Sequence, residues 1–151
     1  MQFSQTGLDL LKRSEGFRSR VYLDAAGFPT IGFGHRLLHP ESFPKGVDEE
    51  QAEQILAGDV REAEEAITRL VKVPLTQGQW DALVDFVFNL GSGRLAGSTL
   101  LKILNQGRYN EAMEQLLLWD HADGQQIASL TERRQAEADL WRGEPAEEQA
   151  A

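Results

Sequence analysis

The stretch SEGFRSRVYLDAAGFPTIGFGH, residues 14–35, holds the signal that decides the fold. Two runs rich in β-prone residues, RVYLD and TIGFG, are separated by AAGFP, where glycine and proline favour a reversal of the chain. The pattern predicts a β-hairpin, and it is the only convincing hairpin signal in the sequence. The preceding LDLL run predicts a first helix with Ser4 or Thr6 as its cap. Glu15 ends this helix, because Gly16 can adopt the left-handed conformation that stops helices.

Helical periodicity dominates the chain after a loop at 37–47. Asp48 and Gln51 have the spacing of a capping box, and the apolar residues that follow recur at helical spacing as far as Val71. This predicts a long helix of about 24 residues, roughly twice the average length. Four shorter helices are expected to start at the TQGQ cap 76–79, at Ser98, at Asn110 and at the SLTE capping box 129–132. The first of these has nearly continuous apolar surface up to the GSG at 91–93, which predicts a buried central helix.

Composition excludes several classes of function. The 151 residues contain no cysteine, which excludes disulfides and thiolate metal sites, and with only three histidines a metal site is not expected. No run of ~18 apolar residues is present, and the N-terminus has no basic segment followed by a long apolar one. Neither a membrane span nor a classical signal peptide is therefore expected. The formal net charge of -9 argues against nucleic acid as a partner.

These elements predict an α+β fold in one domain, residues 1–143. The small N-terminal β-hairpin lobe is expected at about residues 14–47, and the long connecting helix at about 48–71. The helical C-terminal lobe is expected to combine about residues 1–13 with 72–143. The final segment EPAEEQAA, 144–151, is acidic and is expected to be disordered.

The register of the hairpin decides which of its side chains meet. If the chain reverses near Gly27, Asp24 lies directly opposite Thr30. The same register places Tyr22 opposite Gly32. Directly opposed residues share one face of a sheet, so a carboxylate and a hydroxyl at these positions can hold a water between them on an open face. One residue of slip would send them to opposite faces.

A second carboxyl group lies nine residues before Asp24. Glu15 is expected to sit among apolar neighbours at the junction of helix and hairpin, where burial favours its protonated form. A protonated acid that donates to the leaving oxygen, with a carboxylate that activates water, is the pair that glycoside hydrolysis needs, and a positioned water favours inversion. The plainer alternative is a surface hairpin with ordinary solvated charges.

The pattern E-G-x(7)-D with G-x-x-T-I-G-x-G-H resembles the signature of phage-type lysozymes, the muramidase endolysins. The residues that carry it are Glu15, Gly16, Asp24, Gly27, Thr30, Ile31, Gly32, Gly34 and His35. The resemblance continues in FNLGSGRLAGSTLLKILNQGRYNEA, 88–112, and in LTERRQAEADLW, 130–141, and it covers most of residues 7–143. It implies a lysozyme-like fold, with a cleft between two lobes, and no cofactor.

The resemblance also implies roles for individual residues. Glu15 corresponds to the general acid, Asp24 to its acidic partner and Thr30 to the hydroxyl that helps to hold the attacking water. Tyr22 corresponds to an aromatic residue near the cleft. The remaining residues expected to bind substrate are Gly32, His35, Arg133 and, at the floor of the cleft, Phe88 and Asn89. Arg133 corresponds to an arginine that pairs with the catalytic glutamate.

Simpler structural roles compete at several of these positions. His35 is more simply a structural histidine that is hydrogen-bonded to a carboxylate. Gly32 and Gly34 can serve the close approach of substrate or of a neighbouring strand. Arg133 and Arg134 could form a plain surface pair. The three tryptophans, Trp80, Trp119 and Trp141, are more often core or packing residues than sugar-stacking ones.

The function implied by the resemblance is hydrolysis of the β-1,4 bond between N-acetylmuramic acid and N-acetylglucosamine in peptidoglycan, by a monomer. The alternatives are a wall-binding or tail-associated module without turnover, and a chitin-cleaving relative. The expected partner is peptidoglycan polysaccharide, with no nucleic acid and no stable membrane insertion. Because the sequence shows no N-terminal export anchor, the protein is expected to stay in the host cytoplasm until a holin-type opening of the membrane, and then to act on the periplasmic wall.

Overall fold

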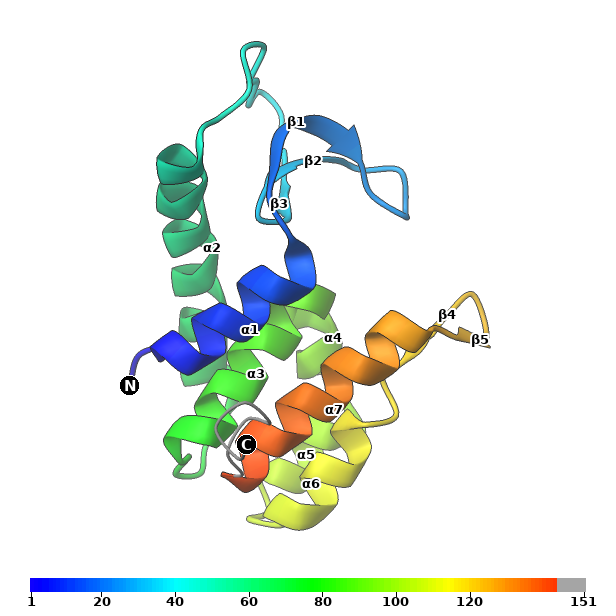
Figure 1. The fold of residues 1–151 in the computed structure, drawn as a ribbon. Helices are drawn as coiled ribbons and strands as arrows, with labels where there is room; N and C mark the ends of the chain where they lie inside the picture. Colours follow the sequence, from blue (N-terminus) through cyan, green and yellow to red (C-terminus); the bar gives the residue numbers. More distant parts are fainter. Residues whose placement is uncertain (144–151) are drawn as a thin grey trace, which may run out of the picture. The chain divides into compact units, whose positions relative to one another are not determined.

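The computed structural model describes residues 1–143, so the tail at 144–151 lies outside the described residues. Over the described range the chain forms seven helices and five short strands (Figure 1). The strands make a three-stranded antiparallel sheet in the order β1-β2-β3 and a separate two-stranded sheet, β4-β5. The predicted α+β class is therefore confirmed.

The chain divides into two compact units. The first, called here the sheet unit, is Leu11–Glu62, and the second, the helical unit, is Met1–Leu10 with Ala63–Ala151. The boundaries fall inside α1, Gln5–Glu15, and inside α2, Glu49–Leu70, so each of these helices contributes residues to both units.

Helix α1 begins and ends where the sequence predicts. The hydroxyl of Ser4 accepts a hydrogen bond from the Gly7 N–H at 3.2 Å, which satisfies one of the free donors of the first turn. The helix ends at Glu15, and Gly16 follows with a φ of 70°.

Three strands follow α1 in the sheet unit. Strand β1, Arg18–Leu23, pairs with β2, Pro29–Gly32, and β2 pairs with β3, His35–Arg36. The predicted hairpin is thus confirmed, whereas the short third strand was not predicted. An irregularity in β1 between Arg18 and Tyr22 sets Arg18, not Tyr22, opposite Gly32.

The register at the turn also differs from the prediction. Tyr22, not Asp24, lies opposite Thr30. The reason is that the reversal begins earlier: the Asp24 N–H donates to the Phe28 carbonyl, and the Gly27 N–H donates to the Asp24 carbonyl, both at 2.9 Å. Asp24 therefore belongs to the turn and not to the strand.

The long helix α2 is confirmed, with 22 residues. Its capping box forms as predicted, because the Gln51 N–H donates to Asp48 Oδ1 at 2.8 Å and the Asp48 N–H donates to Gln51 Oε1 at 2.9 Å. One face of the helix is buried, and the residues that form it are Ala52, Leu56, Val60, Ala63, Ala66 and Ile67.

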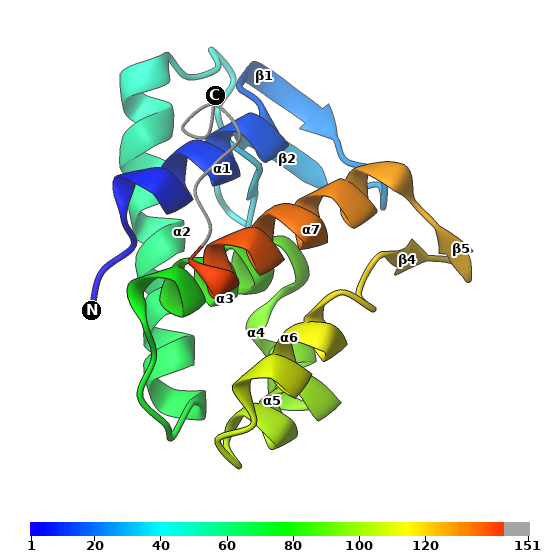
Figure 2. The same cartoon turned by 60° about the horizontal axis from the view of Figure 1, so that its bottom comes forward.

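The helical unit is built on α3, Gln77–Leu90, which Thr76 caps as predicted. Residues 80–87 of this helix are all buried, which confirms the expected central helix. Helix α7, Ala128–Arg142, packs against α3, as Figure 2 shows. Helix α5, Thr99–Leu104, begins after its Ser98 cap and packs against α6, Tyr109–Leu116.

Three local features of the helical unit contradict the sequence analysis. A short helix, α4, Ser92–Ala96, forms directly after the glycine that ends α3. Helix α7 begins at Ala128 after an Ile127 cap, so Ser129 lies inside the helix and the predicted SLTE capping box does not form. A second hairpin, β4 His121–Ala122 and β5 Gln125–Gln126, turns at an Asp-Gly pair whose φ values are 51° and 77°.

The aromatic core agrees with the structural interpretation of the tryptophans. Trp80 and Trp141 are buried, and Trp119 packs edge-on against Phe86, with ring centroids 5.7 Å apart.

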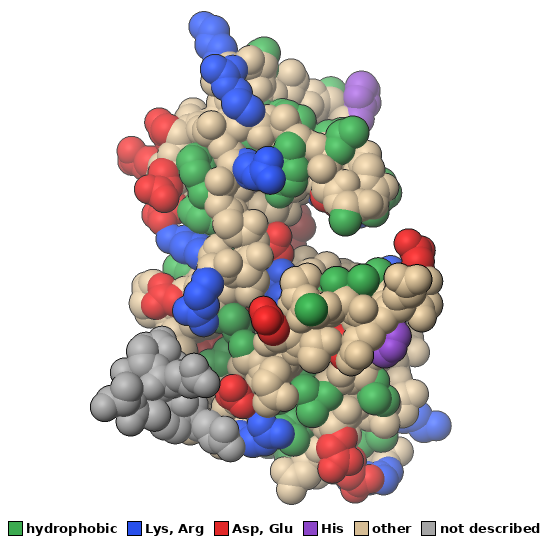
Figure 3. Space-filling model, turned by 45° about the vertical axis from the view of Figure 1, so that its right-hand side comes forward, with side chains coloured by type: hydrophobic (Ala, Val, Ile, Leu, Met, Phe, Trp, Pro, Cys, Tyr) green, Lys and Arg blue, Asp and Glu red, His purple; other side chains and the backbone are tan. Residues whose placement is uncertain are grey.

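On the first hairpin, by contrast, hydrophobic side chains stay on the surface (Figure 3), where Leu23 and Phe28 are exposed. Within residues 1–143, no helix is both long and apolar enough to cross a membrane.

Candidate active site

The side chain of Glu15 rests against the backbone of Gly34. Glu15 is the last residue of α1 and is half-buried. Gly34 has a φ of 75°, and a Cβ atom added there would lie 2.8 Å from Glu15 Cδ and closer still to Oε1. Only a residue without a side chain leaves this space for the carboxyl group. The second glycine of the GFGH segment thus makes room for the predicted general acid.

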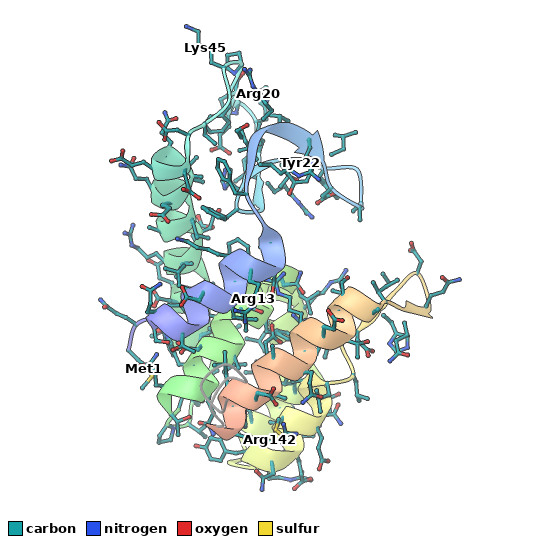
Figure 4. All side chains as sticks on the ribbon, viewed as in Figure 1. Met1, Arg13, Arg20, Tyr22, Lys45 and Arg142 are labelled. Carbon is teal, nitrogen blue, oxygen red and sulfur yellow. The ribbon has the colours of Figure 1, made fainter. Side chains whose placement is uncertain are left out.

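Tyr22 links the candidate residues of the sheet unit. It lies on β1 (Figure 4), directly opposite Thr30 in the sheet. Burial raises the pKa of the Tyr22 hydroxyl, and the negative charge of Glu15 raises it further. The nearby charge of Arg18 lowers this pKa, while that of Asp24 raises it. Tyr22 is therefore in the electrostatic range of both carboxyl groups and is the direct neighbour of Thr30 in the sheet.

Asp24 is held in its ionised form by the turn that it closes. Its Oδ1 accepts hydrogen bonds from the N–H groups of Phe28 and Ala26, each at 2.9 Å. Its Oδ2 accepts from Arg36 Nη2 at 3.3 Å. The hydrogen bond from Phe28 is the main cause that lowers the pKa of Asp24, with help from Ala26 and Arg36. The prediction of an ionised carboxylate is confirmed in direction.

Thr30 is buried, at 3% exposure, and does not stand on the open face that the sequence analysis expected. Its hydroxyl donates to the Phe28 carbonyl at 2.9 Å. This bond fixes the hydroxyl hydrogen and leaves the oxygen lone pairs to accept from a water or a substrate group. Because Phe28 also donates its N–H to Asp24, one turn residue connects the threonine with the carboxylate.

Arg36 is a member of this site that the sequence analysis missed. It follows His35 in β3, pairs with Thr30 across the sheet, and its guanidinium lies 3.9 Å from the centre of the Phe28 ring. It also contacts Asp24, as described above. No local pattern marks Arg36, but its position directly after the GFGH segment places it next to β2.

His35 contacts α2, and the backbone of Gly32 lies close to it. His35 Nδ1 lies 2.8 Å from Asp59 Oδ2, and Nε2 lies 3.0 Å from Glu41 Oε1. The hydrogen bond with Asp59 is the main cause that raises the pKa of His35 to about 9. The interpretation of His35 as a structural histidine bound to a carboxylate is confirmed. Gly32 is buried, and a Cβ atom there would lie 3.2 Å from the Cβ of Ala52.

The remaining predicted residues lie in the helical unit. Arg133, on α7, is buried and donates from Nε and Nη2 to both oxygens of Asp85 on α3, each at 2.9 Å. Arg134 is fully buried and donates from Nη2 to Asn89 Oδ1 at 2.8 Å. The alternative of a plain surface pair is therefore wrong. Phe88 precedes Asn89 near the end of α3, and both are half-buried.

Asp85 was also missed, although the sequence carries a signal for it. It interrupts the apolar run of α3 at a position that faces inward, and an inward-facing aspartate requires a charged partner. That partner, Arg133, is 48 positions away and could not be identified from the pattern alone. Among residues 1–143, no three His, Asp or Glu side chains are placed to hold a metal ion.

Comparisons with known proteins identify the family. Residues 12–137 match the family described as phage lysozyme. The chain is 41% identical over 144 residues to the endolysin of Salmonella phage P22, a match that covers 93% of this chain and 98% of that protein. It is 39% identical over 145 residues to the endolysin of Bacillus phage B103, where it spans only 54% of the relative's length.

Solved structures agree with this assignment. The crystal structure of a point mutant of P22 lysozyme superposes with a TM-score of 0.80 at 38% identity, over 94% of this chain and 99% of that one. The muramidase domain of SpmX from Asticaccaulis excentricus superposes with a TM-score of 0.82 at 35% identity, over 93% and 97% of the two chains. The predicted lysozyme-like α+β fold is confirmed, and the chain belongs to the phage lysozyme family.

Proposed function

We propose that this protein is a muramidase that hydrolyses the β-1,4 bond between N-acetylmuramic acid and N-acetylglucosamine in peptidoglycan. Glu15 acts as the general acid, and Asp24 with Thr30 directs the attacking water. The single observation that carries the proposal is that Tyr22, in the sheet unit, lies opposite Thr30 and within the electrostatic range of Glu15 and Asp24. Membership of a family whose relatives are named endolysins supports it.

The environments of the two carboxyl groups suit different roles. Asp24 has hydrogen-bond donors on both oxygens and stays ionised at neutral pH, as a base or electrostatic stabiliser requires. Glu15 is the last residue of α1, and its carboxyl group lies beside Gly34. It is not part of the turn whose N–H groups bind Asp24. Two carboxyl groups that differ in this way are the arrangement that glycoside hydrolysis uses.

We further propose that the reaction inverts the anomeric configuration. The Thr30 hydroxyl has its hydrogen engaged with Phe28 and keeps acceptor capacity for a water that Asp24 activates. Proton NMR of the first products from a soluble glycan tests this point. An initial α-anomer supports inversion, and an initial β-anomer contradicts it.

Clearing of permeabilised Gram-negative cells tests the activity itself. The wild type is expected to reduce turbidity, and Glu15→Gln, which removes the transferable proton with little change of shape, is expected to abolish the effect. Glu50→Gln on the exposed face of α2 is the matched control and should clear like the wild type. Folded wild-type protein that binds the wall without clearing it would instead support the non-catalytic module.

The partner and place of action follow from this proposal. We propose that a monomer of one domain, residues 1–143, acts on peptidoglycan polysaccharide without stable membrane insertion, after a holin-type opening releases it from the host cytoplasm. Cell fractionation with and without a co-expressed holin tests the release. Release of wall fragments in the absence of holin would contradict it. Tyr22 and Gly32 of the sheet unit and, independently, Phe88, Asn89 and Arg133 of the helical unit are proposed to bind substrate, whereas His35 keeps its structural role.

A further inference from the structure

Four charged side chains are buried together in the helical unit, where α7 packs against α3. They are Asp85, Arg133, Arg134 and Glu137, and none is more than 8% exposed. Arg133 and Glu137 stand one helical turn apart on α7, so they lie on the same face of that helix. Asp85 binds Arg133 through both carboxylate oxygens, as described above.

The two oxygens of Glu137 have different surroundings. Its Oε2 accepts a hydrogen bond from Arg134 Nη2 at 2.8 Å. Its Oε1 is fully buried, and no N–H or O–H group of the described residues donates to it. The carboxyl group of Asp85 is close enough to interact with that of Glu137 as a hydrogen-bond partner. Two carboxyl groups can hydrogen-bond only if one of them carries a proton.

The surroundings decide which of the two carries it. Asp85 has two guanidinium donors from Arg133, whereas Glu137 has one donor from Arg134. Burial and the adjacent Asp85 raise the pKa of Glu137 well above its ordinary value. Burial by itself would raise the pKa of Asp85. The hydrogen bonds from Glu137 and Arg133 outweigh this effect and hold the pKa of Asp85 below its usual range. The numbers of donors and the directions of the two pKa shifts both favour Glu137 as the carrier of the proton.

We propose that Asp85 and Glu137 are positioning residues for Arg133, in which a neutral Glu137 donates a hydrogen bond to the Asp85 carboxylate and Asp85 fixes the guanidinium plane of Arg133. The inference rests on the proposed function, because Arg133 is one of the residues proposed to bind substrate. A bidentate carboxylate sets both the direction and the rotation of a guanidinium group. The donor from Glu137 in turn holds the Asp85 carboxylate in place.

The neutral state of Glu137 also sets the charge of the cluster. The charged groups that face Glu137 are Asp85 from α3 and Arg133 and Arg134 from its own helix. With Glu137 neutral, Asp85 is the anion of this cluster of four side chains. Glu137 then does not compete with Asp85 for Arg133, and Arg134 remains available to Asn89.

Glu137→Gln separates this arrangement from a simple network of ion pairs. Glutamine keeps a donor toward Asp85 and an acceptor toward Arg134, so it imitates the neutral acid. We expect Glu137→Gln to keep wall-clearing activity within about twofold of the wild type. Glu137→Leu, which removes the donor, and Asp85→Asn should each lower kcat by at least about tenfold. Glu132→Gln, an exposed position on the same helix, is the matched control.

Two measurements report on the cluster without any reaction. Infrared spectroscopy at neutral pH should show the carbonyl stretch of a protonated buried acid, which is lost in Glu137→Gln and kept in Glu132→Gln. The Nε–H NMR signal of Arg133, assigned from its absence in Arg133→Lys, should be sharp in the wild type and Glu137→Gln. It should broaden in Glu137→Leu and Asp85→Asn, whose fold is checked by circular dichroism.

The outcomes distinguish this inference from the proposed function. Absence of the protonated-acid band, or an Arg133 signal unchanged by Glu137→Leu and Asp85→Asn, overturns the positioning role even if the wild type clears cells. Equal damage from Glu137→Gln and Glu137→Leu also overturns it, because an ionised Glu137 would then be required. If the band and the Arg133 signal behave as expected but the wild type never clears cells, only the proposed function fails.

Discussion

The carboxyl group of Glu15 occupies the space that a side chain at Gly34 would fill. A Cβ atom at position 34 would lie 2.8 Å from Glu15 Cδ, and Gly34 has a φ of 75°. The glycine therefore serves the placement of the acid as well as the backbone conformation. This relationship joins the end of α1 to the segment between β2 and β3 and gives the first of four predictions.

Gly34→Ala is expected to displace the Glu15 carboxyl group and to reduce clearing activity by about tenfold to 100-fold, because small misplacements of a catalytic group are costly. The positive φ adds a loss of stability of about 1–2 kcal/mol. Gly107→Ala is the matched control, since Gly107 has a φ of 78° and no atom within 4 Å of the added Cβ. It should lose similar stability and keep full activity. Equal activity of the two variants would show that Glu15 does not depend on Gly34.

Replacement of Thr30 separates the role of its hydroxyl from that of its burial. Thr30→Ala removes the hydrogen bond to the Phe28 carbonyl, which should cost about 1 kcal/mol of unfolding free energy. It should also reduce activity by about 100-fold, because the attacking water loses the hydroxyl group that positions it. Thr30→Ser keeps the hydroxyl and should recover most of the activity. Urea unfolding and turbidity assays check both effects, and a serine variant as inactive as the alanine variant would exclude the hydroxyl role.

The contacts of His35 with Asp59 and Glu41 predict a loss of stability at alkaline pH. The hydrogen bond with Asp59 raises the pKa of His35 to about 9 in the folded state, above the ordinary value of 6.5. Protonated His35 therefore stabilises the fold fully below about pH 6.5, and this contribution disappears as the pH rises through about 9. After allowance for solvent screening, we expect a loss on the order of 2 kcal/mol.

Urea unfolding at several pH values between these limits measures that loss directly. His35→Gln should be less stable than the wild type at acidic pH and should lack the decline. His39→Gln, at an exposed histidine, should decline like the wild type. A wild type whose stability is flat across this window would mean that His35 is not charged in the folded protein.

Two glycines in helices predict opposite effects of alanine. Gly58 lies in α2 with no atom within 4 Å of an added Cβ, so Gly58→Ala should stabilise the protein by about 0.5–1 kcal/mol. Gly78 lies at the start of α3, where an added Cβ would meet the Leu140 carbonyl of α7. Gly78→Ala should force α3 and α7 apart and cost about 1–3 kcal/mol. Thermal unfolding of the Gly58→Ala and Gly78→Ala variants measures both effects. Destabilisation by Gly58→Ala would contradict the predicted gain of stability in α2.

Local signals account for the elements that the sequence predicted correctly. The capping box at Asp48 and Gln51, the Thr76 and Ser98 caps and the stop at Gly16 all depend on residues within one helical turn. The failures were also local in part. The Asp-Gly pair of the second hairpin is a recognised local turn signal, and the SLTE segment forms no capping box because α7 begins before Ser129.

By itself, the sequence determined the long helix with its capping box, the helices that Thr76 and Ser98 cap and the existence of the first β-hairpin. Only the tertiary structure decided the hairpin register, the burial of Thr30, the contact of Glu15 with Gly34 and the partners of His35 and Arg133. The physical reason is distance along the chain. Capping and periodicity act through hydrogen bonds between near neighbours, whereas the pair Arg133–Asp85 spans 48 positions and forms only when α7 packs on α3 and removes both charges from water.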